Sequence, residues 1–370
     1  MIMHVSDTHL GKRQYNLDSR EQDVYHAFSQ LVDAAIREHV KAVVHTGDLF
    51  DVYEPSNTAE LVAVRELRRL KERGIPFISI PGDHDTPKRK GTYTHKLLKE
   101  IGLLEVLSTP EQPFTVRDDV QINIFGVPHH PTASKELLRQ LLSNARPREG
   151  RNVLMLHQGM REYLPYENSW QLELGDLPKG FNYYALGHIH SRKREKMPDG
   201  SLLAIAGSPE VMRREEIESY KRDRKGAYLV DLSKGEPNLQ QIDVEVRPQL
   251  EFQVDSETLE SKVEELKVEL SRYHRRPVVH ITLIGKTRRR SDVMEVLSSL
   301  LQVAEYYNLD DRTVVSNGIR ADVKSLGARE IISQYLKENG YTEQEISKIM
   351  QIIEVSDESV EDELRRFAFT

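Results

Sequence analysis

The first part of the chain alternates between short apolar runs and longer amphipathic segments. Apolar runs at 1–6, 40–45 and 77–80 have the length of buried strands. Residues 19–39 and 57–73 place apolar side chains three and four positions apart, which is the spacing of an amphipathic helix. Strand–turn–helix units in succession predict a sheet of parallel strands.

The middle of the chain is richer in strand patterns. Short strands are expected near 104–108, 114–116 and 120–127, buried strands at 152–156 and 183–186, and a helix near 133–144. The segments 201–206, 226–231 and 239–246 alternate apolar and polar side chains, so we expect them to be strands of a second sheet.

A proline at position 248 marks a boundary, because proline cannot donate to the ladder of a strand. Residues 249–322 follow a β-α-β-α-β pattern, which is typical of a small mixed domain. From Ala328 the pattern is helical again, with two amphipathic segments joined by Asn339-Gly340. We therefore divide the chain into three parts, 1–247, 248–325 and 326–370.

Composition narrows the class of protein. The chain has no cysteine, which excludes disulfides and thiolate metal sites and is compatible with a reducing cytoplasm or a hot habitat. We expect a cytoplasmic protein. It has no apolar run of about 18 residues and no signal-peptide pattern, so we expect no association with a membrane. The net charge of -7 means that contact with nucleic acid would have to come from a local basic patch.

Polar side chains that suit a metal site follow five of the expected strands. His188 and His190 come two positions apart after the strand at 183–186, so both rings can face one point. The five strand ends together carry Asp7 and His9, Asp48, Asp83 and His84, His157, and His188 and His190. Any one of these is as readily a strand-end cap or turn residue, but five at carboxyl strand ends favour a shared site. Such a set can hold two divalent ions, with one carboxylate between them.

The order of these motifs resembles that of the calcineurin-like metallophosphoesterases. The motifs are DTHLG, GDLFD, GDHD, HQG and GHIH, and the stretch GDLPKGFNYYALGHIHSRK is similar to one branch, the meiotic recombination eleven nucleases and their bacterial SbcD counterparts. The resemblance is close over about residues 1–250. It implies a four-layer α-β-β-α sandwich with a small α/β capping domain and a C-terminal helical pair.

The resemblance also implies a role for each site residue. Asp7, His9 and His190 would hold a first metal, Asp83, His157 and His188 a second, and Asp48 would bridge them. The family uses two Mn²⁺ ions per chain. His84 would stand free of the metals and protonate the leaving oxygen or stabilise the charged phosphorane, and the carboxylate of Asp51 would orient it.

One position departs from the family pattern. The third motif usually reads Gly-Asn-His, and here Asp83 replaces the asparagine. A carboxylate still binds metal, but it lacks the amide donor and adds a negative charge beside an anionic substrate. For His129 and His130 we favour a loop role over a place at the site.

Three further sets of residues are candidates for contacts with partners. A run without acidic residues predicts contact with DNA phosphates and, alternatively, a solvated loop: Arg272, Arg275, Arg276, Lys286, Arg288, Arg289 and Arg290. The segment 93–101 resembles the homodimer bundle of the family, although core packing is the alternative for Leu97, Leu98 and Ile101. The tail has an apolar stripe that predicts contact with another protein or, alternatively, packing onto the capping domain: Ile331, Ile332, Leu336, Ile349 and Ile353. The resemblance implies that this partner is an SMC-like ABC ATPase.

The resemblance predicts a manganese-dependent nuclease that processes DNA double-strand breaks, with 3′-to-5′ exonuclease activity on duplexes and endonuclease activity on single strands. No glycine-rich phosphate loop of the P-loop type occurs, so ATP hydrolysis would belong to the partner. Two alternatives remain open, a phosphatase built on the same metal core and a DNA-end-binding scaffold whose chemistry is weakened by Asp83.

Overall fold

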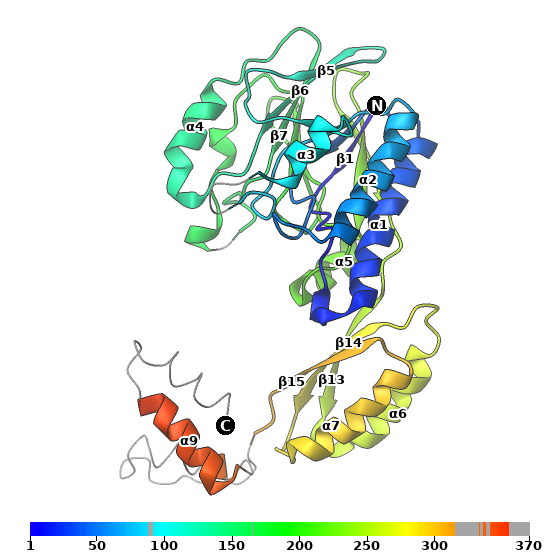
Figure 1. Cartoon of the computed structure of the whole chain (residues 1–370), viewed down its shortest axis with the longest axis vertical. Helices are drawn as coiled ribbons and strands as arrows, with labels where there is room; N and C mark the ends of the chain where they lie inside the picture. Colours follow the sequence, from blue (N-terminus) through cyan, green and yellow to red (C-terminus); the bar gives the residue numbers. More distant parts are fainter. Residues whose placement is uncertain (88–91, 165, 315–332, 334–335, 338–340, 355–370) are drawn as a thin grey trace. The chain divides into compact units, whose positions relative to one another are not determined.

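The computed structural model describes residues 1–87, 92–164, 166–314, 333, 336–337 and 341–354 (Figure 1). The chain forms two compact units, Met1–Arg247 and Pro248–Thr370. In the described part of the chain, no helix combines the length and the apolar character needed to cross a membrane.

The first unit is built on two six-stranded sheets. The first sheet has the order β12-β11-β1-β2-β3-β4. Its strands are β1 (Ile2–Val5), β2 (Val43–His45), β3 (Phe77–Ser79), β4 (Glu105–Val106), β11 (Gly226–Asp231) and β12 (Asn238–Asp243). Strands β1 to β4 are parallel, as the strand–turn–helix pattern predicts.

The expectation that residues 226–231 and 239–246 belong to a second sheet is wrong. Strand β11 pairs antiparallel with β1, and β12 pairs antiparallel with β11, so both extend the first sheet. Alternation along a strand shows which side chains share a face, but it contains no information about which neighbour the strand pairs with.

The second sheet has the order β5-β6-β7-β8-β10-β9. Its strands are β5 (Phe114–Arg117), β6 (Gln121–Val127), β7 (Arg151–Leu156), β8 (Tyr183–Leu186), β9 (Lys193–Lys196) and β10 (Leu202–Ile205). The four central strands are parallel, and the edge strands β5 and β9 run antiparallel to their neighbours.

Three hydrophobic clusters separate four layers. Along β1, Met3 and Val5 pack with the helices on the outer face of the first sheet, whereas Ile2 packs against the second sheet. A third cluster covers the outer face of the second sheet. Figure 1 shows α1 (Asp18–Arg37) and α2 (Asn57–Glu72) beside β1, and α4 (Lys135–Ser143) beyond β7. The four-layer α-β-β-α sandwich is therefore confirmed.

Local signals fix the ends of the elements between the layers. Helix α2 begins after Ser56, whose side chain accepts a hydrogen bond from the backbone N–H of Ala59 (3.2 Å). The remaining helices of the unit are short: α3 (Thr94–Glu100), α5 (Ile217–Asp223), and the 3₁₀ turns η1 (Gln14–Asn16), η2 (Thr132–Ser134), η3 (Glu167–Ser169), η4 (Leu174–Asp176) and η5 (Arg214–Glu216).

The second unit contains a small parallel sheet in the order β13-β14-β15. Its elements are β13 (Gln249–Asp255), η6 (Ser256–Thr258), α6 (Leu259–Leu270), β14 (Val278–Ile284), α7 (Arg290–Ser298), η7 (Ser299–Gln302) and β15 (Tyr306–Asp311). Helices α6 and α7 share one hydrophobic cluster with the sheet, in the β-α-β-α-β order that the sequence predicts. Helix α9 (Glu343–Glu354) follows later in the chain.

Candidate metal centre

The candidate metal ligands gather where parallel strands of the two facing sheets end. Asp7 and His9 follow β1, Asp48 follows β2, and Asp83 follows β3. From the second sheet, His157 follows β7, and His188 and His190 follow β8. The fold therefore collects side chains that are as much as 183 positions apart into one site, because carboxyl ends of parallel strands share an edge.

A first cluster consists of Asp7, His9 and His190. The Nε2 atoms of the two imidazoles lie 3.1 Å apart, and the Nε2 of His190 lies 3.9 Å from Oδ1 of Asp7. Asp7 and His9 are fully buried, and the side chain of His190 is 12% exposed. Three donor atoms thus face one point that is shielded from solvent.

A second cluster consists of Asp83, His157 and His188. Oδ1 of Asp83 lies 3.0 Å from Nε2 of His157 and 3.1 Å from Nδ1 of His188. His157 is buried, but the side chains of Asp83 and His188 are 34% and 24% exposed. The second cluster is therefore the more open of the two.

Asp48 stands between the two clusters. Its Oδ2 lies 3.7 Å from Nε2 of His9 and 3.4 Å from Nε2 of His157, while its Oδ1 accepts a hydrogen bond from the backbone N–H of His84 (2.9 Å). One carboxylate oxygen thus faces both groups, and the other oxygen is fixed by the backbone. This is the position that a bridging ligand needs.

The spacing of these atoms fits divalent metal ions. Donors that hold an ion at about 2.1 Å stand about 3.0–3.5 Å from one another. The ligand atoms of each cluster all lie within 4.8 Å of one another, and three of the pairs are 3.0 to 3.1 Å apart. Carbonyl and carboxylate acceptors opposite Nδ1 of His157 and His190 keep a proton on Nδ1, which leaves the lone pair of Nε2 directed into the site.

The charges in the site perturb one another strongly. Burial alone would raise the pKa of Asp48, but the neighbouring His157 and His9 lower the pKa below its usual value. Burial alone would lower the pKa of His157, but Asp48 in particular raises it well above the usual value. The same opposition lowers the pKa of Asp83, where burial is outweighed by His157 and His188. Such mutual shifts are typical of a functional site.

The backbone is strained where the ligands sit. Asp7, His9, Asp48 and His188 have φ values of 50°, 45°, 55° and 75°, in the left-handed region that non-glycine residues rarely adopt. A Cβ atom at Gly82 would lie 2.0 Å from Oδ1 of Asp48, so only glycine permits this close approach. The motif glycines are therefore required by the packing of the ligands.

The structure corrects the role expected for Asp51. Nδ1 of His84 lies 2.6 Å from the backbone carbonyl oxygen of Asp51, so the carbonyl orients this histidine. The carboxylate of Asp51 instead faces Nδ1 of His9 (3.3 Å) and Nζ of Lys12 (3.0 Å). Burial would raise the pKa of Asp51, but His9 and Lys12 lower it to about 2. Its side chain therefore lies beside His9, a candidate metal ligand.

Asp85 is a structural residue of the site that the sequence analysis did not single out. Its buried carboxylate accepts hydrogen bonds from the backbone N–H groups of Leu49 (3.2 Å), Phe50 (3.0 Å) and Gly82 (2.9 Å). It thereby joins the loop that carries Asp48 to the loop that carries Asp83. Its place in the GDHD motif was the available signal.

His129 lies closer to the site than we expected. Its ring stacks on that of His188 (centroids 5.8 Å apart, planes at 22°), and its backbone N–H bonds to the carbonyl of Pro81 (3.0 Å). It also lines the cavity above the ligands, whereas His130 does not. Burial lowers the pKa of His129 to about 4.

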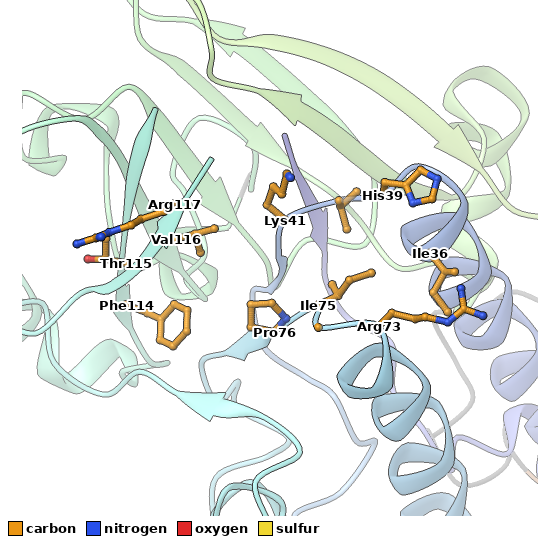
Figure 2. A pocket seen from close by; sticks show the side chains of 12 residues that line it. Ile36, His39, Lys41, Arg73, Ile75, Pro76, Phe114, Thr115, Val116 and Arg117 are labelled. Atoms are coloured by element: carbon orange, nitrogen blue, oxygen red, sulfur yellow. The ribbon is translucent and has the colours of Figure 1, made fainter. Parts of the chain in front are cut away.

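A cavity of about 730 Å³ opens over the two clusters. Its wall includes Asp48, Asp83 and His84, and the exposed ring of Tyr166 stands at its side. A second groove of about 560 Å³ lies at the opposite ends of the strands. Figure 2 shows Arg73 and Arg117 of that groove directed away from one another, with Phe114 and Pro76 between them. The cationic groups there do not converge on one ligand.

Two members of the expected basic run are paired within the second unit. Nζ of Lys286 lies 2.7 Å from a carboxylate oxygen of Glu257. The guanidinium of Arg288 forms a salt bridge with the carboxylate of Glu260 (2.5 Å). Arg289 and Arg290 are exposed, and in the described residues their side chains have no ionic partner. Arg272 and Arg276 are also exposed, while Arg275 is partly buried.

The environment of helix α3 divides the residues expected at a dimer interface. Leu97 and Ile101 are 51% and 49% exposed, but Leu98 is 1% exposed and belongs to the core of the first unit. The expectation for Leu98 is therefore corrected, because it faces inward one position along the helix from Leu97. Of the residues expected to bind a partner ATPase, Ile331 and Ile332 and the side chain of Ile353 lie outside the described residues, and Leu336 and Ile349 are partly buried.

Comparison with known proteins agrees with this geometry. Residues 1–192 match the model of the calcineurin-like phosphoesterase family. The chain is 44% identical over 378 residues to the DNA double-strand break repair protein Mre11 of Sulfolobus acidocaldarius, covering 99% of this chain and 98% of that one. It is 45% identical over 376 residues to the Mre11 of Saccharolobus solfataricus, with the same coverage. The Mre11 of Methanocaldococcus jannaschii is 32% identical over 92% of this chain and 91% of its own length.

These similarities extend over both units of the chain and include the segments that supply the clustered aspartates and histidines. The chain therefore belongs to the calcineurin-like phosphoesterases and, within them, to the Mre11 family of DNA double-strand break repair proteins.

Proposed function

We propose that this chain is a manganese-dependent nuclease that processes DNA double-strand breaks. The observation that carries the proposal is the pair of Asp/His clusters that share Asp48 at one edge of the sandwich. Two divalent ions bound there would supply a hydroxide at neutral pH and neutralise charge on a phosphodiester. The relatives of nearly equal length are named as DNA double-strand break repair proteins, which supports DNA as the substrate.

His84 is suited to move a proton without being a ligand. The carbonyl of Asp51 accepts from its Nδ1, so Nε2 is the atom that exchanges a proton with a leaving oxygen in the cavity. The carboxylate of Asp83 lies 4.0 Å from this Nε2. Tyr166, which is 76% exposed at the same cavity, offers a ring on which an unstacked base can rest.

A second candidate is a DNA-end-binding scaffold with weak chemistry. Asp83 favours it, because this carboxylate is 34% exposed in the cavity and would stand beside the phosphate of the substrate. The negative charge opposes an anionic substrate, although the same group completes the second cluster.

One experiment separates these functions from a phosphatase. Labelled linear duplex DNA, labelled single-stranded DNA and a phosphate monoester are each incubated with the protein and Mn²⁺, with EDTA as a control. We expect shortening of the duplex from its 3′ ends and internal cuts in the single strand, with little release from the monoester. Binding of DNA ends without cleavage would favour the scaffold, and cleavage of the monoester alone would favour a phosphatase.

We propose further that the basic run of the second unit contacts the DNA backbone. Arg289 and Arg290 carry this part of the proposal, because both are exposed and Arg288 is occupied by Glu260. Replacing both with Gln should flatten the slope of log affinity against log salt by about 0.7–0.9 for each lost phosphate contact. Arg288→Gln is the matched control and should change the slope less. Equal effects of the two changes would refute the assignment.

Two protein contacts complete the proposal. Exposed Leu97 and Ile101 of α3 would form a homodimer surface, which Leu97→Glu should disrupt as judged by light scattering. The tail beyond residue 327 would bind an SMC-like ABC ATPase. A chain that lacks residues 328–370 should still cut short single strands but should no longer co-purify with that ATPase. Retained binding, or loss of solubility, would make the tail a structural part of this chain.

A further inference from the structure

One histidine of the first cluster is held by a carboxylate that lies 26 positions further along the chain. Nδ1 of His190 lies 2.8 Å from Oε1 of Glu216, the last residue of η5. A carboxylate accepts hydrogen bonds, so Nδ1 carries the proton and Nε2 offers its lone pair toward Asp7 and His9. Glu216 is 6% exposed, so water does not compete for this contact.

The other oxygen of Glu216 is fixed by a buried lysine. Nζ of Lys225 lies 2.5 Å from Oε2 of Glu216, 2.8 Å from Oγ of Ser208 and 2.9 Å from the carbonyl oxygen of His190 itself. The hydroxyl of Ser208 and the backbone N–H of Met212 also donate to Oε2 (3.2 and 3.3 Å). With Oε2 saturated and Lys225 only 2% exposed, Oε1 has one direction in which to point.

From this geometry we propose that Glu216, locked by Lys225, is a positioning residue that sets the tautomer and orientation of His190. It thereby sets the affinity of the first metal position. The inference rests on the proposed metal-dependent function. A partner behind the second ring nitrogen of a ligating histidine typically changes metal affinity about 10–100-fold when it is lost. Lys225 touches both the carboxylate and the backbone of His190, so the three groups move as one unit.

A purely structural role for the Glu216–Lys225 pair is the alternative, and the chain offers a matched control. Glu210 is fully buried in the same segment and pairs with Arg20 (3.2 Å). Glu210→Gln removes a buried ionic contact without touching His190. It should lower the melting temperature while leaving the metal affinity and the His190 tautomer unchanged.

The decisive variants exploit the two ends of a glutamine side chain. In Glu216→Gln, Lys225 claims the amide oxygen, so the amide nitrogen faces Nδ1 of His190 and drives its proton to Nε2, the atom meant for the metal. In the double variant Glu216→Gln/Lys225→Met, the charged donor is gone and the hydroxyl of Ser208 can donate to the carbonyl of Glu210 (2.8 Å) instead. Only the backbone N–H of Met212 (3.3 Å) then still holds the amide oxygen away from Nδ1. A positioning role therefore predicts that the second change partly rescues the first. A structural role predicts that removing the buried lysine as well lowers the Mn²⁺ affinity further.

The measurements are Mn²⁺ titration by calorimetry and the ring-nitrogen NMR shifts of His190 in the metal-free protein. We expect Glu216→Gln to weaken one of the two metal positions by about 10–100-fold and to change the tautomer, with the double variant closer to the parent. Unchanged affinity and tautomer in Glu216→Gln, or a double variant worse than the single, would overturn the proposal. The tautomer is read without metal or DNA, so this outcome is separate from a failure of the nuclease assay.

Discussion

The two halves of the metal centre differ in what stands behind their histidines. In the first half, Nδ1 of His9 faces the carboxylate of Asp51 and Nδ1 of His190 faces that of Glu216. In the second half, Nδ1 of His157 donates to the backbone carbonyl of Thr46 (2.7 Å). His188 presents Nδ1 itself to Asp83.

This difference predicts that the two positions bind metal with unequal affinity. A carboxylate behind an imidazole makes the ring a more basic ligand than a neutral carbonyl does. The first half is also the more buried, since Asp7 and His9 are at most 1% exposed whereas Asp83 is 34% exposed. We therefore expect the first position to fill at lower Mn²⁺ concentration and the second to exchange more readily.

The largest effect should come from Asp48→Ala, which removes the oxygen that faces both halves. We expect Mn²⁺ occupancy to fall at both positions and cleavage to be lost, with the fold retained. Calorimetry and far-UV circular dichroism test this, with Asp119→Ala as an exposed control. If either position kept its parental affinity, Asp48 would serve one half alone.

His84→Ala should leave both halves filled and still slow cleavage. His84 also lies near Asp48 and Asp83, but its Nδ1 is held by the carbonyl of Asp51 and we assign it to proton transfer. Its loss should then remove proton transfer and charge stabilisation, typically about 10²–10⁴-fold in rate. Single-turnover cleavage at saturating Mn²⁺ measures the rate, and His26→Ala on the exposed face of α1 is the control. Loss of one ion in His84→Ala would show that His84 is a ligand.

Lowering the pH should weaken metal binding at the two positions to different extents. In the metal-free protein, Asp48 in particular raises the pKa of His157 well above its usual value against the effect of burial, while burial lowers the pKa of His190. The pKa of His9 is also raised, but less strongly. A metal must displace the proton from His157, so below that pKa each pH unit costs the second position about tenfold in affinity.

Mn²⁺ titrations at about pH 8 and about pH 6 test this order, because both values are accessible without protonating free carboxylates. The second position should weaken first as the pH falls, and its binding should release more protons into the buffer. Equal pH slopes for the two positions would remove this distinction between the halves.

The smallest change is expected from Asp83→Asn, which alters the second half alone. The amide keeps an oxygen ligand, offers a donor to the phosphate and removes one negative charge from the cavity. We expect faster cleavage at saturating Mn²⁺, by a factor of a few, and weaker binding at the second position. A slower rate at saturation would mean that the carboxylate is adapted to its own site.

Much of the centre follows from the amino-acid sequence by itself. Strand periodicity and the polar residues that follow each apolar run identified Asp7, Asp48 and Asp83 as neighbours, because parallel strands end at a common edge. The sequence also indicated the order of elements in the second unit and the boundary at Pro248. These are local properties, in which a residue and its neighbours along the chain decide the outcome.

Tertiary structure alone decided how the ligands are supported. The carboxylate of Asp51 faces His9, whereas its backbone carbonyl accepts the hydrogen bond from His84. Sequence spacing does not show which of these two acceptors of one residue a histidine contacts. Glu216 reaches His190 across 26 positions because β10 pairs in parallel with β8, so the segments that follow these two strands leave the sheet at the same edge. Sequence periodicity assigns a side chain to a face, but the atom that it contacts depends on which distant element packs against that face.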